Sequence, residues 1–442
     1  MNMEEIIERA QRGECRNEQE HDMIVFRESE RLAKKHGIVW NREEVLPEEK
    51  MADSLFIAAA EFLVLVGVLY VDENRVISIT DGDVEEALRV RHNVKIGRGN
   101  EEVELKKRKP GDGKRPLYVG GPIGGTVSEE VFKDLHESIA REGVCGLYTG
   151  ALETYNGVQC AAKSPMALLA VWREVEWARE ACVRAGKPGL ALFGPSTSSR
   201  AEHFLSVANS MGLGPSDVSE VYMLDELKVD REAIVKLVHH RKLGNHVITG
   251  QCPMLGASTG SAEGLAIVEA AEALGAYVIV SPTIHGTGPV HINYHASSLP
   301  EVLWASNLVC LALSRNSDIL TGRYYWNLSG MGTTMNLLET SAQVLGDIYC
   351  GREIIMGPVG RGGDRPDMAS GMDAQLVNGV LDLFCGKPSD AVAEAIERTV
   401  SQYREEVKNA PEGVPFGKCY GRGLRPKKVY SRMVEDILSG LI

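Results

Sequence analysis

Hydrophobic and polar positions divide the chain into two stretches with different rhythms. In the first stretch apolar positions recur with helical spacing, as in Glu49–Gly67, where Leu55 and Phe62 fall on one face. In the second stretch short apolar runs alternate with amphipathic segments. We therefore expect an N-terminal, mainly helical extension over residues 1–114. It should pack on a second region, residues 115–442, that ends in helices.

Eight short apolar runs give the second region its rhythm. Strands that alternate with helices pair in parallel, and eight such units close into a barrel without sheet edges. We expect an α/β fold of the (β/α)8 TIM-barrel type, and a doubly wound open sheet is the alternative. The predicted strands are Leu117–Ile123, Val144–Thr149, Gly189–Phe193, Glu220–Asp225, His246–Gln251, Tyr277–Pro282, Asp318–Tyr325 and Ile354–Val359.

The carboxyl ends of the predicted strands carry the candidate chemistry, because TIM-barrel active sites are built from these ends and the loops after them. Phe193 ends the third run, Asp225 and Glu226 close the fourth, Gln251 ends the fifth, and His285 follows the sixth. A carboxylate here can orient an ammonium group or act as a base. A helix cap or a structural ion pair is the alternative for the acidic pair, and loop packing is the alternative for the histidine.

Tyr324, Tyr325 and Trp326 form the densest aromatic cluster in a chain that is only 6% aromatic. Alternation along a strand sends Tyr324 and Trp326 to one face and Tyr325 to the other. Packing alone explains many such clusters. The sharper alternative is a face that binds a cation.

Charge and cysteine content narrow the class of protein. A formal net charge of −13 argues against nucleic-acid binding, and the basic run Lys106–Arg115 is interpreted as a solvated linker. The nine cysteines show no CxxC pair and no metal-ligand spacing, which predicts a reducing compartment and no metal site. Because no signal peptide and no membrane-spanning apolar segment is evident, we expect a cytoplasmic protein that does not contact a membrane.

Several general catalytic motifs are incomplete. Gly120–Gly125 lacks the Lys-Ser/Thr pair of a phosphate-binding loop, and Gly194–Ser198 lacks the second glycine of a nucleophile elbow. No lysine ends a predicted strand, which disfavours a barrel lyase or aldolase that works through a Schiff base.

Ordered landmarks along most of the chain resemble the monomethylamine:corrinoid methyltransferase family. None of them is a universal motif, so their joint order and spacing make the resemblance specific. The landmarks are Gly121-Pro122, Val127–Phe132, Lys163–Pro165, Gly186–Gly189, Asp225–Lys228, Gly288–Ile292, Asp318–Leu320, Ala342-Gln343 and Gly351–Ile354.

This resemblance implies a TIM-barrel enzyme of methanogenesis or related one-carbon metabolism. It would pass a methyl group from a small methylated amine to Co(I) on a separate corrinoid protein. The corrinoid would then come with that partner, and no cofactor would be bound tightly by this chain. The resemblance also implies a homo-oligomer, commonly a hexamer.

The chain departs from the family at the reactive centre. Phe193 stands where the family carries pyrrolysine, whose imine ring is thought to capture and activate the amine. By the same alignment, Gly250 replaces a glutamate and Tyr324 a glutamine, whereas Asp225-Glu226 and His285 are retained. Because phenylalanine has no electrophilic carbon, the identity of the substrate does not carry over.

A quaternary amine fits these changes, because it already carries the charge that makes nitrogen a good leaving group. We expect Phe193, Glu226 and Tyr324 to be catalytic, and the same three to bind substrate together with Asp225, Gln251, His285 and Trp326. One alternative is a monomethylamine demethylase with a recoded or substituted pyrrolysine site. Another is a non-catalytic scaffold that binds the corrinoid protein.

Overall fold

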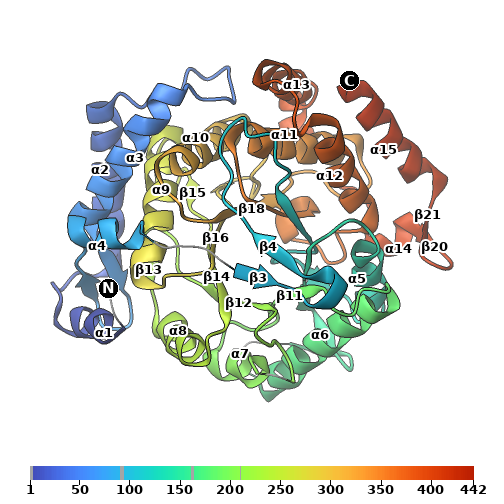
Figure 1. Ribbon diagram of the computed structural model, residues 1–442, viewed down its shortest axis with the longest axis horizontal. Coiled ribbons are helices and arrows are strands. Elements are labelled where there is room, and N and C mark those ends of the chain that lie inside the picture. The colour runs from blue at the N-terminus through green and yellow to red at the C-terminus, as the bar shows by residue number, and fades with distance from the viewer. Residues whose placement is uncertain (1–2, 90–93, 161–163, 210) are drawn as a thin grey trace.

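A closed barrel of eight parallel strands forms the centre of the molecule (Figure 1), in a computed structural model that describes residues 3–89, 94–160, 164–209 and 211–442. Each barrel strand is followed by a helix on the outside. The predicted TIM barrel is thereby confirmed. The strands are β5 (Leu117–Gly120), β7 (Gly146–Tyr148), β11 (Ala191–Gly194), β12 (Val218–Tyr222), β14 (His246–Gln251), β16 (Ile284–Thr287), β18 (Thr321–Trp326) and β19 (Ile354–Val359).

The sixth predicted strand, Tyr277–Pro282, is wrong. Its first residues form the last turn of helix α9 (Ala262–Ile279), and the strand is β16 instead. Almost every residue of α9 is buried, so its last turn is as apolar as a buried strand. Periodicity does not separate these two cases in a short apolar run. As a consequence, His285 lies within a barrel strand and not in the loop after it.

The barrel helices form a ring around the strands (Figure 1). Besides α9 they are α5 (Phe132–Ala140), α6 (Pro165–Arg184), α7 (Ala201–Val207), α8 (Arg231–Leu243), α10 (Pro300–Asn316), α11 (Thr334–Cys350) and α12 (Gly371–Phe384). Two C-terminal helices, α13 (Ser389–Ser401) and α15 (Lys428–Leu441), lie against α11 and α12. Among the described residues, no helix is both long enough and apolar enough to cross a membrane.

Residues 3–89 cover one side of this ring (Figure 1). This segment contains α1 (Met3–Arg12), α2 (Glu18–His36), α3 (Glu49–Val66), α4 (Asp81–Ala87) and the short strands β1 (Val68–Tyr70) and β2 (Arg75–Ile77). Helices α2 and α3 pack on α9, and α3 also packs on α10. Strand β1 pairs in parallel with β13 (Lys228–Val229), which ties the segment to the loop after β12.

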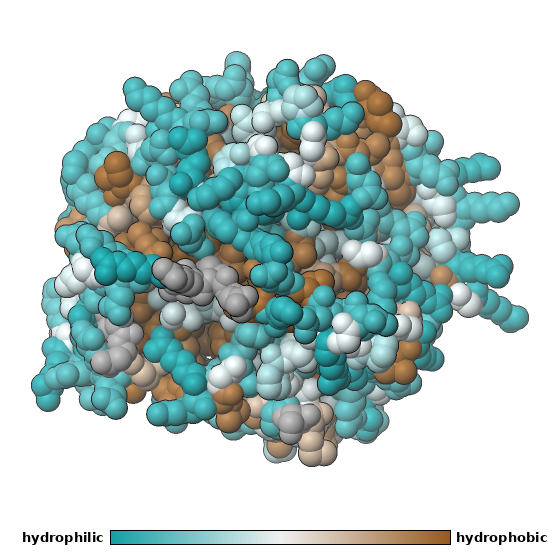
Figure 2. All heavy atoms as spheres, in the orientation of Figure 1, coloured by the Kyte–Doolittle hydropathy of each residue, from teal (hydrophilic) through white to brown (hydrophobic). Residues whose placement is uncertain are grey.

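A hairpin of β3 (Val94–Ile96) and β4 (Val103–Leu105) lies across the centre of the barrel in Figure 1. Its Ile96 and Leu105 join the apolar cluster inside the barrel. The amide of Gly97 donates to the carbonyl of Ser216, just before β12. The hairpin therefore closes the amino end of the barrel, and Figure 2 shows a mostly hydrophilic surface on that side. Substrate access is left to the carboxyl end.

The basic run Lys106–Arg115 is not the fully solvated linker that the sequence suggested. Lys107 forms an ion pair of 2.8 Å with the buried carboxylate of Glu353. Arg108 is only 3% exposed and donates to the carbonyls of Arg352 and Asp347. Arg108 is buried and Lys107 half-buried because backbone carbonyls and the carboxylate of Glu353 pair with them.

Candidate active site

Aromatic side chains fill the interior of the barrel. The rings of Phe193 and Tyr148 lie 5.3 Å apart, and the ring of Tyr324 meets Tyr148 edge-on at 6.2 Å. All three side chains are fully buried. Gly146 makes room for Phe193, because a Cβ there would lie 2.6 Å from the Cε2 of that ring. Phe193 therefore belongs to the packed floor of the site and does not reach solvent.

Trp326 lies above this floor at the end of β18. Its ring stacks on Tyr324 with centroids 6.3 Å apart and an interplanar angle of 16°. The indole nitrogen donates to the carbonyl of Ile123 at 3.2 Å, which fixes the orientation of the ring. Tyr325 points to the other side of the strand, where its hydroxyl donates to Asp347 at 2.7 Å. The predicted alternation in this aromatic cluster is confirmed.

A cavity of about 410 Å³ opens at the carboxyl end of the barrel. The aromatic residues Phe204, Tyr222 and Trp326 line it, and so do the predicted residues Asp225 and Gln251. Tyr222 is 40% exposed and Leu224, also on the lining, is 39% exposed, so the cavity reaches the surface. The charged lining residues are four acids and one base: Glu220, Asp225, Asp230, Glu232 and Lys236.

Glu220 was not among the site residues predicted from the sequence, but it is the most deeply buried carboxylate of the cavity. It lies within β12, and its side chain is 1% exposed. The hydroxyl of Tyr222 donates to one carboxylate oxygen at 3.0 Å, and the hydroxyl of Ser196 donates to the other at 3.3 Å. Burial, together with nearby Glu174, raises the pKa of Glu220 to about 8. The group is therefore mainly protonated at neutral pH.

Asp225 and Gln251 each form a hydrogen bond with a backbone group at the rim of the cavity. The carboxylate of Asp225 accepts a hydrogen bond from the amide of Cys252, and burial raises its pKa. The side-chain amide of Gln251 donates to the carbonyl of Leu224 at 2.7 Å. Its Oε1 has no hydrogen-bond partner among the described residues, which leaves one acceptor available near the cavity.

Four predicted site residues do not line the cavity: Phe193 and Tyr324, which are packed in the floor beneath it, and Glu226 and His285, which lie outside it. Glu226 adopts a left-handed conformation with φ of 58°, its amide donates to Glu272, and its carbonyl accepts from His21. Burial, together with Asp225, raises the pKa of Glu226 to about 7. His285 lies beside Thr249, 3.0 Å from its hydroxyl, and burial lowers the pKa of His285 to about 3. Neither side chain lines the cavity in this structure.

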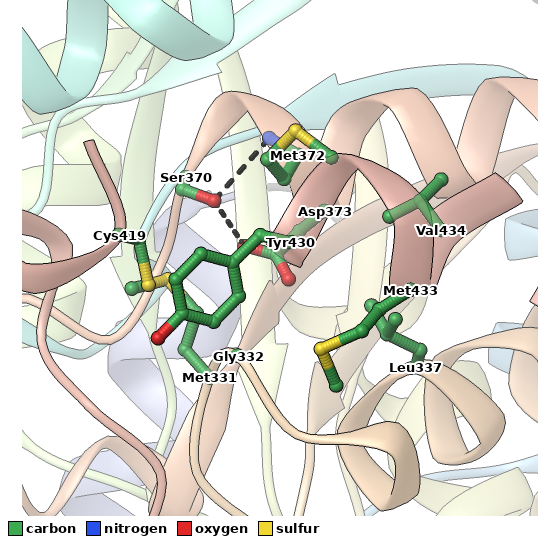
Figure 3. A pocket seen from close by; sticks show the side chains of 10 residues that line it. All are labelled: Met331, Gly332, Leu337, Ser370, Met372, Asp373, Cys419, Tyr430, Met433 and Val434. Atoms are coloured by element: carbon green, nitrogen blue, oxygen red, sulfur yellow. Dashed lines mark hydrogen bonds between the residues drawn. The ribbon is translucent and has the colours of Figure 1, made fainter. Parts of the chain in front are cut away.

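Another enclosed space lies beneath α15, at the side of the barrel (Figure 3). Its volume is about 10 Å³, room for one water molecule. Ser370 donates to Asp373 at 2.9 Å and caps α12 there, which gives these polar groups a structural role. Within the described ranges, no group of three or more His, Cys, Asp or Glu side chains is arranged to hold a metal. The cavity at the barrel mouth is therefore the better candidate for substrate.

Comparisons with known proteins match almost the whole chain to one family. The family model described as "Monomethylamine methyltransferase MtmB" matches residues 1–441. The chain is 31% identical to monomethylamine methyltransferase MtmB2 of Methanosarcina acetivorans and 32% identical to MtmB1 of that organism. Each match covers 98% of this chain and 95% of the relative. The crystal structure of the Methanosarcina barkeri monomethylamine methyltransferase superposes with a TM-score of 0.95 at 30% identity, covering 99% of this chain and 98% of that one. The hydroxylamine complex of MtmB gives the same values.

Proposed function

The chain belongs to the MtmB family of monomethylamine methyltransferases, and from this premise we propose that its methyl donor is a small quaternary amine. The acceptor in this proposal is Co(I) of a corrinoid that a partner protein carries. One observation carries the choice of donor: the cavity is lined by three aromatic residues and by four acidic residues against one basic residue.

A quaternary ammonium ion has no N–H group and cannot be recognised by hydrogen bonds. It binds instead to aromatic faces and to negative charge, which are strongest where water is excluded. The rings of Tyr222 and Trp326 offer such faces, and Glu220 lies beside Tyr222 with its carboxylate facing the same cavity. Ionised Glu220 would balance the charge of the bound cation.

The packing around Phe193 argues against a recoded pyrrolysine site. Pyrrolysine is much longer than phenylalanine, and the ring of Phe193 packs against Tyr148, which in turn packs against Tyr324. A long side chain at this position would force the ring of Tyr148 to move. The three aromatic residues instead pack as a closed floor, which supports a pocket adapted to another substrate.

The residues of this chain would act by positioning the substrate. The acceptor supplies a cobalt nucleophile when the partner presents it at the open carboxyl end of the barrel. Tyr222 and Trp326 would hold the ammonium nitrogen and exclude water from the methyl group. As the methyl carbon–nitrogen bond breaks, the electron pair stays on nitrogen, and a neutral tertiary amine leaves without needing a proton.

Methyl transfer to cob(I)alamin tests the proposal. Tetramethylammonium should convert cob(I)alamin to methylcobalamin, measured by absorbance, and Trp326→Ala should slow this at least about tenfold while Trp326→Phe retains most of the rate. Turnover of monomethylamine alone would contradict the proposal. Binding of the corrinoid protein without turnover of any amine would favour the non-catalytic scaffold instead.

We also propose that the protein is a homo-oligomer in the cytoplasm. Large apolar side chains on α2 and α3 are exposed, among them Phe26 at 46%, Ile57 at 60% and Leu65 at 49%. Such a surface is typical of a protein interface. Light scattering coupled to gel filtration should give a mass well above 48.2 kDa, and a hexamer if the family resemblance extends this far.

A further inference from the structure

Lys236 is the one basic side chain among the residues that line the cavity. It lies on the buried face of α8 with Ala233, Leu237 and His240, and it is only 5% exposed. Its Nζ sits 4.8 Å from the centre of the Phe204 ring. Throughout the described ranges no carboxylate lies within 4 Å of this ammonium group, and no acceptor makes a hydrogen bond with it.

The nearest carboxylates have other partners. Asp230 caps α8 by accepting from the amide of Ala233 at 2.8 Å. Glu232 accepts from the amide of Ala201 and lies 3.7 Å from Arg200. Glu220 is engaged by Tyr222 and Ser196. These acids therefore stabilise the ammonium of Lys236 only at longer range.

A buried ammonium group that has a ring face but no carboxylate or hydrogen-bond acceptor beside it is still costly, because its charge is not balanced at close range. Burial accordingly lowers the pKa of Lys236. Because this side chain lines an open cavity, a bound ligand can supply the missing anion. Ser199 lines the same cavity and is exposed, so its hydroxyl can also donate to an anion, whereas the hydroxyl of Ser198 is engaged by His203 and the amide of Arg200.

We propose that Lys236 binds a carboxylate of the substrate, which makes the preferred methyl donor a zwitterion. This inference rests on the proposed function, because it places the quaternary ammonium group of the same molecule against Tyr222 and Trp326. Lys236 comes from α8, whereas Trp326 comes from β18, so the cavity has separate sites for opposite charges. The substrate class is therefore a small N-trimethylated amino acid.

Binding measurements separate this inference from the proposed function. The probes are N,N,N-trimethylglycine and tetramethylammonium, which share the cationic group and differ in the carboxylate. Calorimetry on the wild-type protein should show tighter binding of trimethylglycine. Lys236→Met keeps the apolar stem and removes the charge. It should lower the affinity for trimethylglycine about tenfold or more and should not lower the affinity for tetramethylammonium.

Lys242→Met is the matched control, because Lys242 is an exposed lysine on the same helix, and it should change neither affinity. Thermal unfolding checks that the Lys236 variants are folded, and Lys236→Gln serves as the second variant if Lys236→Met is not. The inference is overturned if folded Lys236 variants bind trimethylglycine as tightly as the wild type. It is also overturned if acetate alone binds as tightly as trimethylglycine. Failure of tetramethylammonium to bind the wild type would instead count against the proposed function.

Discussion

The ring of Tyr324 lies directly over the backbone of Gly286 inside the barrel. A Cβ at Gly286 would stand 2.2 Å from the hydroxyl oxygen of Tyr324 and 2.4 Å from its Cζ. Gly250 on the neighbouring strand is similarly placed, since its Cβ would lie 2.7 Å from that hydroxyl and 2.2 Å from the Cε1 of Tyr222. Positions 250 and 324, where the resemblance implied changes from the family, are thus sterically linked: Tyr324 occupies space that a side chain at 250 would need.

Gly286→Ala should destabilise the protein by about 1 to 3 kcal/mol, because an extra methyl group in a packed core displaces its neighbours. Urea unfolding measures this change. Since Tyr324 is the residue displaced, Tyr324→Leu should relieve the clash. The double variant should then be at least about 1 kcal/mol more stable than the sum of the two single effects implies. Strictly additive effects would contradict the contact.

Most of the fold could be predicted from the sequence because β/α periodicity is a local signal. Seven of the eight apolar runs overlap barrel strands, and the ordered landmarks predicted the family that the comparisons confirm. The prediction of the sixth strand failed because α9 is buried on nearly all sides and is therefore as apolar as a buried strand, whereas β16 contains the non-apolar residues His285 and Gly286. The hairpin that closes the barrel was missed because its strands are only three residues long.

The candidate site was predicted less completely than the fold. The expectation that active-site residues lie at the carboxyl ends of strands identified Asp225, Gln251 and Trp326, which line the cavity. Glu220 was missed because the fourth predicted strand starts at this residue, whereas β12 begins at Val218 and places Glu220 in the middle of the strand. Lys236 carried a signal, since it shares helical spacing with the buried residues Ala233, Leu237 and His240.

A buried charge network joins α11 to the barrel wall and gives a second prediction. Asp347 is fully buried and accepts from Tyr325, and both Arg323 and Arg352 lie within 4 Å of its Oδ1. Asp347→Ala leaves two buried guanidinium groups without their carboxylate, so it should lower the free energy of unfolding by about 3 to 5 kcal/mol. Chemical denaturation measures the loss.

Tyr325→Phe is the control for this network, because it removes one hydrogen bond and leaves all three charges. It should cost only about 0.5 to 1.5 kcal/mol. Equal effects of the two variants would mean that the hydrogen bond, and not the charge balance, stabilises this region.

The pH dependence of cation binding follows from Glu220. Burial raises the pKa of this carboxyl to about 8, so most of it carries a proton in the free protein at pH 7. A bound cation favours the ionised form and so lowers the pKa of Glu220 in the complex. Affinity for tetramethylammonium should therefore rise with pH, by up to about tenfold per unit below pH 8, and level off above it. Calorimetry in buffers with different ionisation enthalpies should detect the release of a proton on binding near pH 7.

Glu220→Gln tests whether this group is responsible. The variant keeps the shape and the hydrogen bond from Tyr222 but cannot ionise, so its affinity should be low and nearly independent of pH between 6 and 9. Asp225, Asp230, Glu232 and Lys236 also line the cavity and remain in the variant, so any slope that persists belongs to them. A wild-type affinity that is constant over this range, or one that falls as the pH rises, would rule out Glu220 as the counterion of the bound cation.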